Sequence, residues 1–441
     1  MKPTRSGSPP PLEPPPRGPR RPLLVMKFGG TSVANIERIR NIARRALESH
    51  RAGNDVVVVV SAMSGETDRL LKLAHQLLPV PHGRELDVLA ATGEQVSVAL
   101  TAMALQAEGA SASSFLGHQL PVLTDSAFTQ ARIQWVEKGP IHQALARGQI
   151  AVVAGFQGVD AGNNITTLGR GGSDTTAVAV AAALGADVCE IYTDVDGVYT
   201  ADPRVCPSGR KLQAIAYEDM LELASLGAKV LQVRSVEIAM KYSVPVHVRS
   251  SFQEEEGTFI VPREQVLEAR QLTGLACERG QARVELLGAE CRPDLVAEVT
   301  DLVAELRVTV DMLCHSRGPL EESRADISFT LPEGELLRAR QPLEQFMGRL
   351  GAHELRTRRN LAKVSLVGIG LRSDPGIAAR VCRGLTRQGI SVVGLSVNEL
   401  RVSCLVDAAA ADQALRILHE DFGLASEAGP DAGGLTSSAP A

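Results

Sequence analysis

The sequence has little of what marks nucleic-acid-binding, membrane-spanning or metal-binding proteins. Its 441 residues carry a net charge of −5, and the 46 Lys and Arg residues are dispersed, which argues against nucleic acid and anionic membranes as partners. No apolar run is long enough to span a bilayer. The seven cysteines form no Cys-x-x-Cys pair and fall mostly in apolar segments, and the nine histidines show no metal-ligand spacing. We therefore expect a cytoplasmic protein with reduced core cysteines and no metal held by its own side chains.

The two ends of the chain offer almost nothing to bury. Residues 1–22 are mainly Pro, Arg, Gly and Ser, and residues 426–441 are small and polar. Segments of this composition cannot bury enough apolar surface to fold, so we expect two flexible tails. The apolar run 23–26 is too short for the core of a signal peptide, and Lys27 interrupts it. The length leaves room for two or three globular domains between the tails.

Residues 23–265 alternate between apolar strands and helical stretches. The strand-like segments are almost continuously apolar, and they lie at residues 23–28, 56–60, 150–154, 188–191 and 244–248. Strands of this kind are typical of a mostly parallel sheet that helices cover on both faces. We therefore predict a three-layer α/β domain in which ligands bind beyond the C-terminal ends of the strands.

The segment 168–176, Leu-Gly-Arg-Gly-Gly-Ser-Asp-Thr-Thr, has the composition of an anion-binding loop. Its glycines let a ligand approach the main chain, and Arg170 supplies a planar guanidinium suited to a carboxylate or phosphate. An Ala- and Val-rich helical run follows at 177–184, so the anion would meet the N–H groups and the dipole of a helix N-terminus. A glycine-rich turn that only caps the helix is the structural alternative.

Two further loops follow predicted strands. Lys27 lies near the end of the first strand, before a Gly29-Gly30-Thr31-Ser32 turn, where its ammonium could reach nucleotide phosphates. This turn lacks the G-x-x-x-x-G-K-[ST] pattern of a P-loop. The helix after it has its apolar positions at Ile36, Ile39 and Ala43. The loop 192–204 mixes carboxylates, two tyrosines and an arginine, but its glycine comes too early for an EF-hand calcium loop.

Residues after 265 contain an internal repeat. The segments 283–288 and 363–368 are strand-like and lie 80 residues apart. Each precedes a helix, two further strands and a second helix, which indicates a βαββαβ unit of the ferredoxin-like type. We place the first unit at residues 270–355 and the second at residues 360–425.

Together these segments resemble the amino-acid kinase superfamily and, within it, the aspartate kinase family. The matching motifs are Lys27 to Ser32, Ser61-Ala62-Met63, Gly155 to Gly158, Thr166 to Thr176 and Thr193 to Arg204. The resemblance runs over residues 23–425, and the two repeated units resemble ACT domains. It implies transfer of the γ-phosphoryl group of ATP to the β-carboxylate of L-aspartate, which is the first step of lysine, threonine and methionine biosynthesis. Magnesium would be carried largely by the ATP phosphates.

The resemblance also implies roles for individual residues. Catalytic roles would fall to Lys27, Asp174 and Lys229. ATP would be bound by Lys27, Phe28, Gly29, Gly30, Ser61, Thr193, Asp194, Tyr199, Asp202 and Arg204. Aspartate would be bound by Thr67, Glu94, Arg170, Gly171, Gly172, Ser173 and Asp174. Arg170 would contact its α-carboxylate and Glu94 its α-ammonium; the structural alternatives are helix caps for Glu94 and Thr67 and a surface lysine for Lys229.

ACT domains often bind amino acids at domain interfaces. The resemblance therefore implies feedback inhibition by lysine, threonine or both. It also implies a homo-oligomer that is joined through these units. Effector contacts are expected at Ser373, Asp374, Gly376 and Asn398. The first unit has Glu290-Cys291-Arg292-Pro293-Asp294 where the second has the family's Asp-Pro-Gly turn, so we expect fewer or weaker effector sites than two intact units would give. Two alternative functions stay open, namely a kinase of another small acid and a catalytically silent amino-acid sensor.

Overall fold

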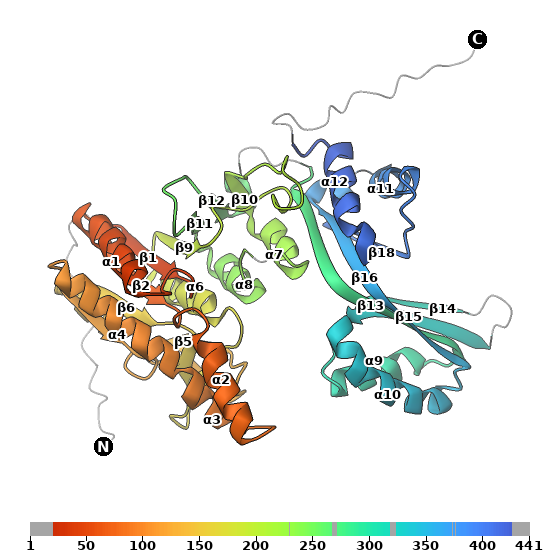
Figure 1. Ribbon diagram of the computed structural model, residues 1–441, viewed down its shortest axis with the longest axis horizontal. Helices are drawn as coiled ribbons and strands as arrows, with labels where there is room; N and C mark the ends of the chain where they lie inside the picture. The colour runs from red at the N-terminus through yellow and green to blue at the C-terminus, as the bar shows by residue number, and fades with distance from the viewer. Residues whose placement is uncertain are drawn as a thin grey trace, which may run out of the picture.

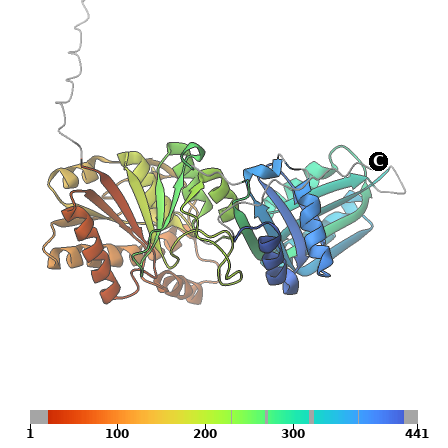
Figure 2. The ribbon, with the colours of Figure 1, turned by 90° about the horizontal axis from the view of Figure 1, so that it is seen from above.

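The chain forms two parts that lie side by side (Figure 1, Figure 2). The first, coloured red to green, is built on an eight-stranded sheet, and the second, coloured teal to blue, is built on a six-stranded sheet. This computed structural model describes residues 21–228, 230–266, 271–317, 323–372, 374 and 376–425. Most of both predicted tails, and the predicted site residues Lys229 and Ser373, therefore lie outside the described residues.

The large sheet has the spatial order β10-β12-β11-β9-β1-β2-β6-β3. Its strands are β1 (Leu23–Phe28), β2 (Asp55–Val60), β3 (Ala112–Phe115), β6 (Ile150–Ala154), β9 (Val188–Thr193), β10 (Ala214–Ala216), β11 (Val246–Ser250) and β12 (Thr258–Val261). All neighbouring strands are parallel except β11 and β12. The predicted, mostly parallel sheet is confirmed, although its last predicted strand begins two residues later, at Val246.

Successive valines of β2 explain why the strands are continuously apolar. Val57 and Val59 belong to one buried cluster, and Val56, Val58 and Val60 belong to another on the opposite face of the sheet. The helices on the first face are α5 (Gly139–Ala146), α6 (Gly172–Leu184), α7 (Tyr217–Ser225) and α8 (Val233–Tyr242). The second face is covered by α1 (Ile36–Arg51) and α4 (Thr92–Ala107), so the three predicted layers are present.

The buried face of helix α1 begins one turn after its first residue. Asn35 caps this helix by accepting a hydrogen bond from Arg38 N, so Ile36 is its first residue. Ile39 and Ala43 are buried, whereas Ile36 is 50% exposed. The apolar positions that predicted this helix therefore do not all pack into the core.

A second, smaller sheet precedes the Gly-rich segment 168–176. Its order is β5-β4-β7-β8, and its strands are β4 (Val122–Thr124), β5 (Ile133–Val136), β7 (Gln157–Val159) and β8 (Ile165–Thr167). Helices α2 (Glu66–Leu77) and α3 (Gly83–Ala90) lie beside it, and α3 packs against β8. The chain leaves β8 directly into the Gly-rich segment that precedes α6.

The six-stranded sheet of the second part has the order β14-β15-β13-β16-β18-β17. Its strands are β13 (Gly274–Glu290), β14 (Asp311–Arg317), β15 (Arg324–Pro332), β16 (Glu354–Val367), β17 (Gly394–Val397) and β18 (Arg401–Asp407). Its helices are α9 (Leu295–Glu305), α10 (Glu333–Leu350), α11 (Gly376–Arg387) and α12 (Ala411–Asp421), with short 3₁₀ turns at Arg263–Gln265, Ile369–Arg372 and Ala408–Ala410. Two buried clusters fill this part, one under α9 and α10 and one under α11 and α12.

Strands β13 and β16 are long enough to belong to both units. Residues 281–286 of β13 pair with β15, and residues 281–287 pair with the first half of β16. Residues 274–279 pair only with the second half of β16. Strand β18 then pairs with residues 361–367 of β16. The second unit thus completes its sheet with residues 274–279, which the sequence analysis placed in the first unit.

One stretch of the described chain, Gly83–Ala107, is long and apolar enough to cross a membrane by length and composition, which the sequence analysis did not anticipate. The helix is interrupted at Ala91 between α3 and α4, and half of the stretch is buried inside the protein. Val98 and Leu105 belong to the core under α1. These observations identify the stretch as a core element of the first part.

None of the seven cysteines, all of which are described, forms a disulfide. Cys189, Cys206 and Cys404 are buried, as the composition predicts, whereas Cys314 is exposed on β14. Groups of three or more His, Cys, Asp or Glu side chains that could hold a metal ion are absent from the described part of the chain.

A buried lysine joins the two units of the second part. Lys363 of β16 is 4% exposed, and its ammonium lies 2.8 Å from Glu278 Oε2 and 2.6 Å from Asp311 Oδ2. Asp311 also contacts Arg401 of β18 at 3.3 Å. Burial opposes ionisation of Asp311, but the hydrogen bond and charge of Lys363 outweigh it and lower the pKa of this carboxyl. A strand of the first unit is therefore tied to two strands of the second.

We expect Lys363→Ala to lower the free energy of unfolding by about 2 kcal/mol, because it leaves two carboxylates partly buried without their shared cation. Urea denaturation followed by circular dichroism measures this change. The exposed residue Lys72 provides a control, and Lys72→Ala should have almost no effect. Equal stability of the two variants would show that the Lys363 pairs do not hold the units together.

Candidate active site

Several of the predicted ATP-binding residues lie at the C-terminal ends of β1, β2 and β9, and the turn at Gly155 follows β6. Gly29 N, just after β1, donates a hydrogen bond to Tyr192 O of β9 at 3.3 Å, and Ser61 N, just after β2, donates to Phe28 O at 3.1 Å. Gly155 N, after β6, donates to Val60 O at 2.9 Å. Because the strands are parallel, their following loops meet at one edge of the sheet.

The two glycines after β1 have no side chains, which leaves space next to the buried ammonium of Lys27. A Cβ on Gly29 would lie 3.4 Å from Lys27 Nζ, and a Cβ on Gly30 would lie 3.2 Å from Ala62 O. Phe28 points to the other face of the sheet, where its ring stacks on Tyr192 at 4.6 Å. Of the predicted ATP-binding residues, Phe28 therefore offers the site its backbone and not its side chain.

Lys27 and Asp174 form the charged centre of the site. Lys27 Nζ lies 2.5 Å from Asp174 Oδ1, and the two residues are only 7% and 8% exposed. Asp174 belongs to the first turn of α6, whose N–H groups favour negative charge. The predicted catalytic pair is thus brought together between β1 and the N-terminus of α6.

The Gly-rich segment before α6 presents Arg170 to solvent. Gly169 and Gly171, on either side of it, have φ angles of 77° and 71°, which a residue with a Cβ rarely adopts. A Cβ on Gly171 would also lie 1.6 Å from the side chain of Gln232, before α8. Arg170 is exposed at the tip of this turn, and Ser173 is buried behind it.

Two side chains that sequence reasoning missed, the buried Asp87 and the half-buried Arg234, hold this segment in place. The Asp87 carboxylate of α3, which is 1% exposed, accepts hydrogen bonds from Thr129 N at 2.9 Å, from Thr167 N at 2.9 Å and from Thr167 Oγ1 at 2.6 Å. Arg234 of α8 donates to Leu168 O at 2.7 Å. Burial raises the pKa of Asp87, although these hydrogen bonds lower it. Neither Asp87 nor Arg234 belongs to a local sequence motif, so their contacts with the Gly-rich segment can be recognised only in the folded structure.

Glu94 is a buried carboxylate with one free oxygen. It lies in the first turn of α4, is 2% exposed, and accepts a hydrogen bond from Ala62 N at 2.9 Å through Oε1. Its Oε2 has no hydrogen-bond partner among the described residues. Burial raises the pKa of Glu94 to about 7, against the weaker effect of the Ala62 hydrogen bond. Such a group suits a ligand ammonium, because the ammonium would supply the missing partner. Thr67, in the first turn of α2, is half-buried.

The loop after β9 carries the predicted nucleotide residues, several of which are paired with one another. Thr193 donates to Asp194 Oδ1 at 3.1 Å, and Asp202 forms an ion pair with Arg204 at 2.8 Å. Tyr199 donates its hydroxyl proton to the carboxylate of Asp196 at 3.0 Å. Asp194 and Arg204 are exposed, while the other three predicted residues are half-buried.

The sequence analysis quoted Asp196 within this loop but gave it no role. Its carboxylate contacts Lys211 Nζ at 3.1 Å, and an isolated bridge joins Tyr199 to Lys211. Burial opposes ionisation of Asp196, but the hydrogen bonds from Lys211 and Tyr199 outweigh it and lower its pKa. Asp196 and Lys211 therefore hold the shape of the loop around Tyr199.

The predicted effector residues lie in turns of the second unit. Asp374 is exposed, and its Oδ1 accepts a hydrogen bond from Gly376 N at 2.8 Å. Asn398 Oδ1 accepts hydrogen bonds from Leu400 N at 3.2 Å and from Arg401 N at 2.8 Å, which closes the turn between β17 and β18. In the first unit, Arg292 instead forms an ion pair with Glu298 at 2.8 Å.

Comparison with known proteins identifies the family. A model of the amino acid kinase family matches residues 22–250, and a model of the ACT domain matches residues 364–422. An aspartokinase of Mycolicibacterium smegmatis is 47% identical over 412 residues, which cover 92% of this chain and 97% of that protein. The chain belongs to the aspartokinase family. An aspartokinase of Pseudomonas aeruginosa is 47% identical over 404 residues, covering 91% of this chain and 98% of that one.

Solved aspartokinase structures share the whole architecture. Escherichia coli aspartokinase III in complex with aspartate and ADP has a TM-score of 0.74 at 25% identity, covering 91% of this chain and 100% of that chain. The complex of aspartokinase III with lysine and aspartate has a TM-score of 0.71 at 25% identity, covering 90% of this chain and 99% of that chain. The family and the fold class inferred from the motifs are thus confirmed, whereas the roles of individual residues stay predictions.

The raised pKa of Glu94 gives a test on the ligand-free protein. Between pH 4.5 and about 7 the folded state holds a proton that the unfolded state releases, so Glu94 makes the protein less stable as pH rises through this range. We expect Glu94→Gln to be more stable than the wild type by about 2 to 3 kcal/mol at pH 8 and to lose this advantage near pH 4.5.

Urea denaturation at pH 5 and pH 8 measures the effect. Glu108→Gln, which alters an exposed residue at the end of the same helix, is the control and should show no such pH dependence. A constant stability difference across this pH range would contradict the raised pKa of Glu94.

Proposed function

We propose that the chain transfers the γ-phosphoryl group of ATP to the β-carboxylate of L-aspartate and releases ADP and 4-phospho-L-aspartate. The strongest support is the buried pair of Lys27 and Asp174, 2.5 Å apart, between the glycine turn and the N-terminus of α6. Relatives with 47% identity are aspartokinases, and an E. coli relative was solved with aspartate and ADP. The proposed reaction would be the first step of lysine, threonine and methionine biosynthesis.

The reaction joins two anions, so its main requirement is positive charge at the point of transfer. The substrate carboxylate, with a pKa of about 3.9, is already ionised at pH 7 and needs no general base. Lys27 and the N–H groups of Gly29 and Gly30 would neutralise the phosphates, and Asp174 would hold the Lys27 ammonium in position. Magnesium would arrive with ATP. Lys229, outside the described residues, remains a candidate for a second cation.

Two charged side chains would fix the non-reacting ends of aspartate. Arg170 would bind the α-carboxylate, and the free Oε2 of Glu94 would accept a hydrogen bond from the α-ammonium. An ammonium at this place favours the ionised form of Glu94, whose pKa is otherwise raised to about 7. Ser173, the N–H groups of Gly171 and Gly172, and Thr67 would line the same pocket. The loop with Thr193, Asp194, Tyr199, Asp202 and Arg204, together with Ser61, would hold the nucleotide.

The wild-type chain should phosphorylate L-aspartate with Mg-ATP at a much higher kcat/KM than L-glutamate, because the two end contacts leave room for one methylene before the phosphoryl group. A hydroxamate assay across small acids measures this. Equal activity on glutamate would favour a kinase of another small acid, and no activity on any acid would favour an amino-acid sensor.

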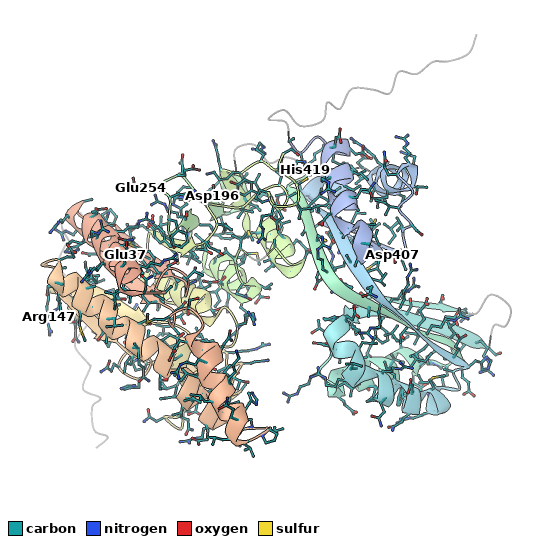
Figure 3. The ribbon with its side chains drawn as sticks, in the orientation of Figure 1. Glu37, Arg147, Asp196, Glu254, Asp407 and His419 are labelled. Atoms are coloured by element: carbon teal, nitrogen blue, oxygen red, sulfur yellow. The ribbon has the colours of Figure 1, made fainter. Side chains whose placement is uncertain are left out.

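The same assay separates the roles of the two cations. Arg170→Ala should mainly raise the KM for aspartate, since it removes binding to a carboxylate that does not react. Lys27→Ala should chiefly lower kcat, by roughly 100-fold or more, if the ammonium contacts the transferring phosphate. Arg147→Ala, on the outer edge of the first part (Figure 3), is the control. Unchanged aspartate kinetics in both folded variants would refute the site assignment.

We further propose that lysine, threonine or both inhibit the enzyme through the ACT units, and that the chain forms a homo-oligomer through the same units. End products lack the reactive carboxylate, so they need a second site. An E. coli relative solved with lysine and aspartate in its T-state supports this proposal. The Asp374 turn is present only in the second unit, and Arg292 is paired with Glu298 in the first.

Asp374→Ala should weaken inhibition and leave the uninhibited kcat unchanged, because it removes an effector contact at the regulatory unit. A coupling of about 1 to 3 kcal/mol would be enough for strong inhibition. Titration of lysine and threonine, singly and together, against the wild type, Asp374→Ala and the control Glu420→Ala provides the measurement. Absence of inhibition of the wild type in every combination would leave the ACT units as dimerisation elements.

A further inference from the structure

A buried histidine joins the second ACT unit to the loop after β9. His419 of α12 is 1% exposed; its Nε2 lies 3.0 Å from Thr200 Oγ1 and its Nδ1 lies 3.4 Å from Ser208 Oγ. Thr200 is also 1% exposed. Figure 3 shows His419 at the place where α12 meets the first part of the protein. A residue close to the C-terminal end of the fold is therefore in direct contact with the predicted nucleotide loop.

The surroundings of this imidazole favour its neutral form. Thr200 Oγ1 accepts a hydrogen bond from Arg210 N at 2.9 Å, and it can donate its own proton to Nε2 of His419. Burial lowers the pKa of His419, which favours the uncharged ring. Each ring nitrogen has a hydroxyl group within hydrogen-bonding distance.

The loop segment 200–206 is packed into the core of the second ACT unit. Ala201 and Cys206 belong to the same buried cluster as Leu418 of α12. Leu275 N of β13 donates a hydrogen bond to Thr200 O at 2.7 Å. A Cβ on Gly274 would lie 2.8 Å from the same Thr200 oxygen, so the two backbones are in close contact.

The opposite end of the loop is fixed to the first part of the protein. Val198 N donates to Thr258 Oγ1 of β12 at 2.8 Å, and Leu212 N donates to Val198 O at 2.8 Å. Tyr199 lies between this anchor and Thr200, and Asp202 follows two residues later. Tyr199 thus lies between an anchor on the large sheet and an anchor on α12, and Asp202 lies just beyond the second anchor.

We propose that His419 is a positioning residue for the nucleotide loop, so that the second ACT unit forms part of the structure that binds ATP. This inference rests on the proposed role of residues 193–204 in nucleotide binding. Loss of the imidazole frees Thr200 and lets Tyr199 and Asp202 move, which weakens ATP binding and leaves the aspartate pocket and the chemical step intact.

His419→Ala should raise the KM for ATP by about tenfold, the effect of losing one or two buried hydrogen bonds. The KM for aspartate and kcat should stay nearly the same. His419→Gln, whose amide extends toward the position of Nε2, should restore most of the ATP affinity. His419→Asn, whose amide reaches only the position of Nδ1, should restore little. Calorimetric titration with ADP gives the nucleotide affinity independently of turnover.

Leu385→Ala is the control, because it removes a fully buried side chain of α11 from the same cluster without removing a hydrogen bond to the loop. It should lower the melting temperature at least as much as His419→Ala and leave the ATP affinity unchanged. An unchanged ADP affinity in folded His419→Ala, or an equal loss in Leu385→Ala, overturns the positioning role. If the wild type binds ADP but does not phosphorylate aspartate, the proposed reaction fails while the role of His419 is still decided by the titration. If it binds no ADP, both fail.

Discussion

A cation buried next to an anion, between β1 and α6, is the constraint on which the rest of the structure depends. Removing two charges from water costs several kcal/mol for each ion unless each is held against its partner. The sheet meets this requirement because Lys27 shares a face with Val25, toward α6, and Asp174 occupies the first turn of that helix. Glycines 29 and 30 then leave the ammonium accessible from one side. The layers, the turn and the helix N-terminus together hold one positive charge next to the open glycine turn, where the proposed reaction requires it.

The sequence predicted the parts of this arrangement that depend on local pattern. Continuous valine runs, such as that of β2, indicated a sheet covered on both faces, and the glycines around Arg170 indicated a turn before a helix. The sequence could not reveal the features of the site that depend on contacts between distant segments. Asp87 meets Thr167 across 80 residues, and His419 meets Thr200 across 219 residues. Helical periodicity groups Ile36 with Ile39 and Ala43, but it does not reveal that Ile36 is exposed at the start of the helix.

The two parts of the molecule are less separate than a division into domains suggests. Segment 200–206 belongs by sequence to the first part but contributes Ala201 and Cys206 to the core under α12. Lys363 and Asp311 join the two ACT units in a similar way, through a charge pair that is largely shielded from water. The boundary between the two parts of the molecule and the boundary between the two ACT units are each stabilised by a buried polar contact surrounded by apolar packing. These contacts fix the position of one side of each boundary relative to the other.

The pairing of residues 274–279 with the second half of β16 also limits how early during synthesis the six-stranded sheet can be completed. During synthesis this segment appears about 90 residues before its partner strand, and loop closure over such a distance is slow compared with local folding. The large sheet has all of its strands by residue 261, so it can form early. The loop that carries Tyr199 and Asp202, however, gains its last anchor only when α12 has been made. The loop that follows β9 therefore stays incompletely anchored in the nascent chain until almost the last residue of the fold has been added.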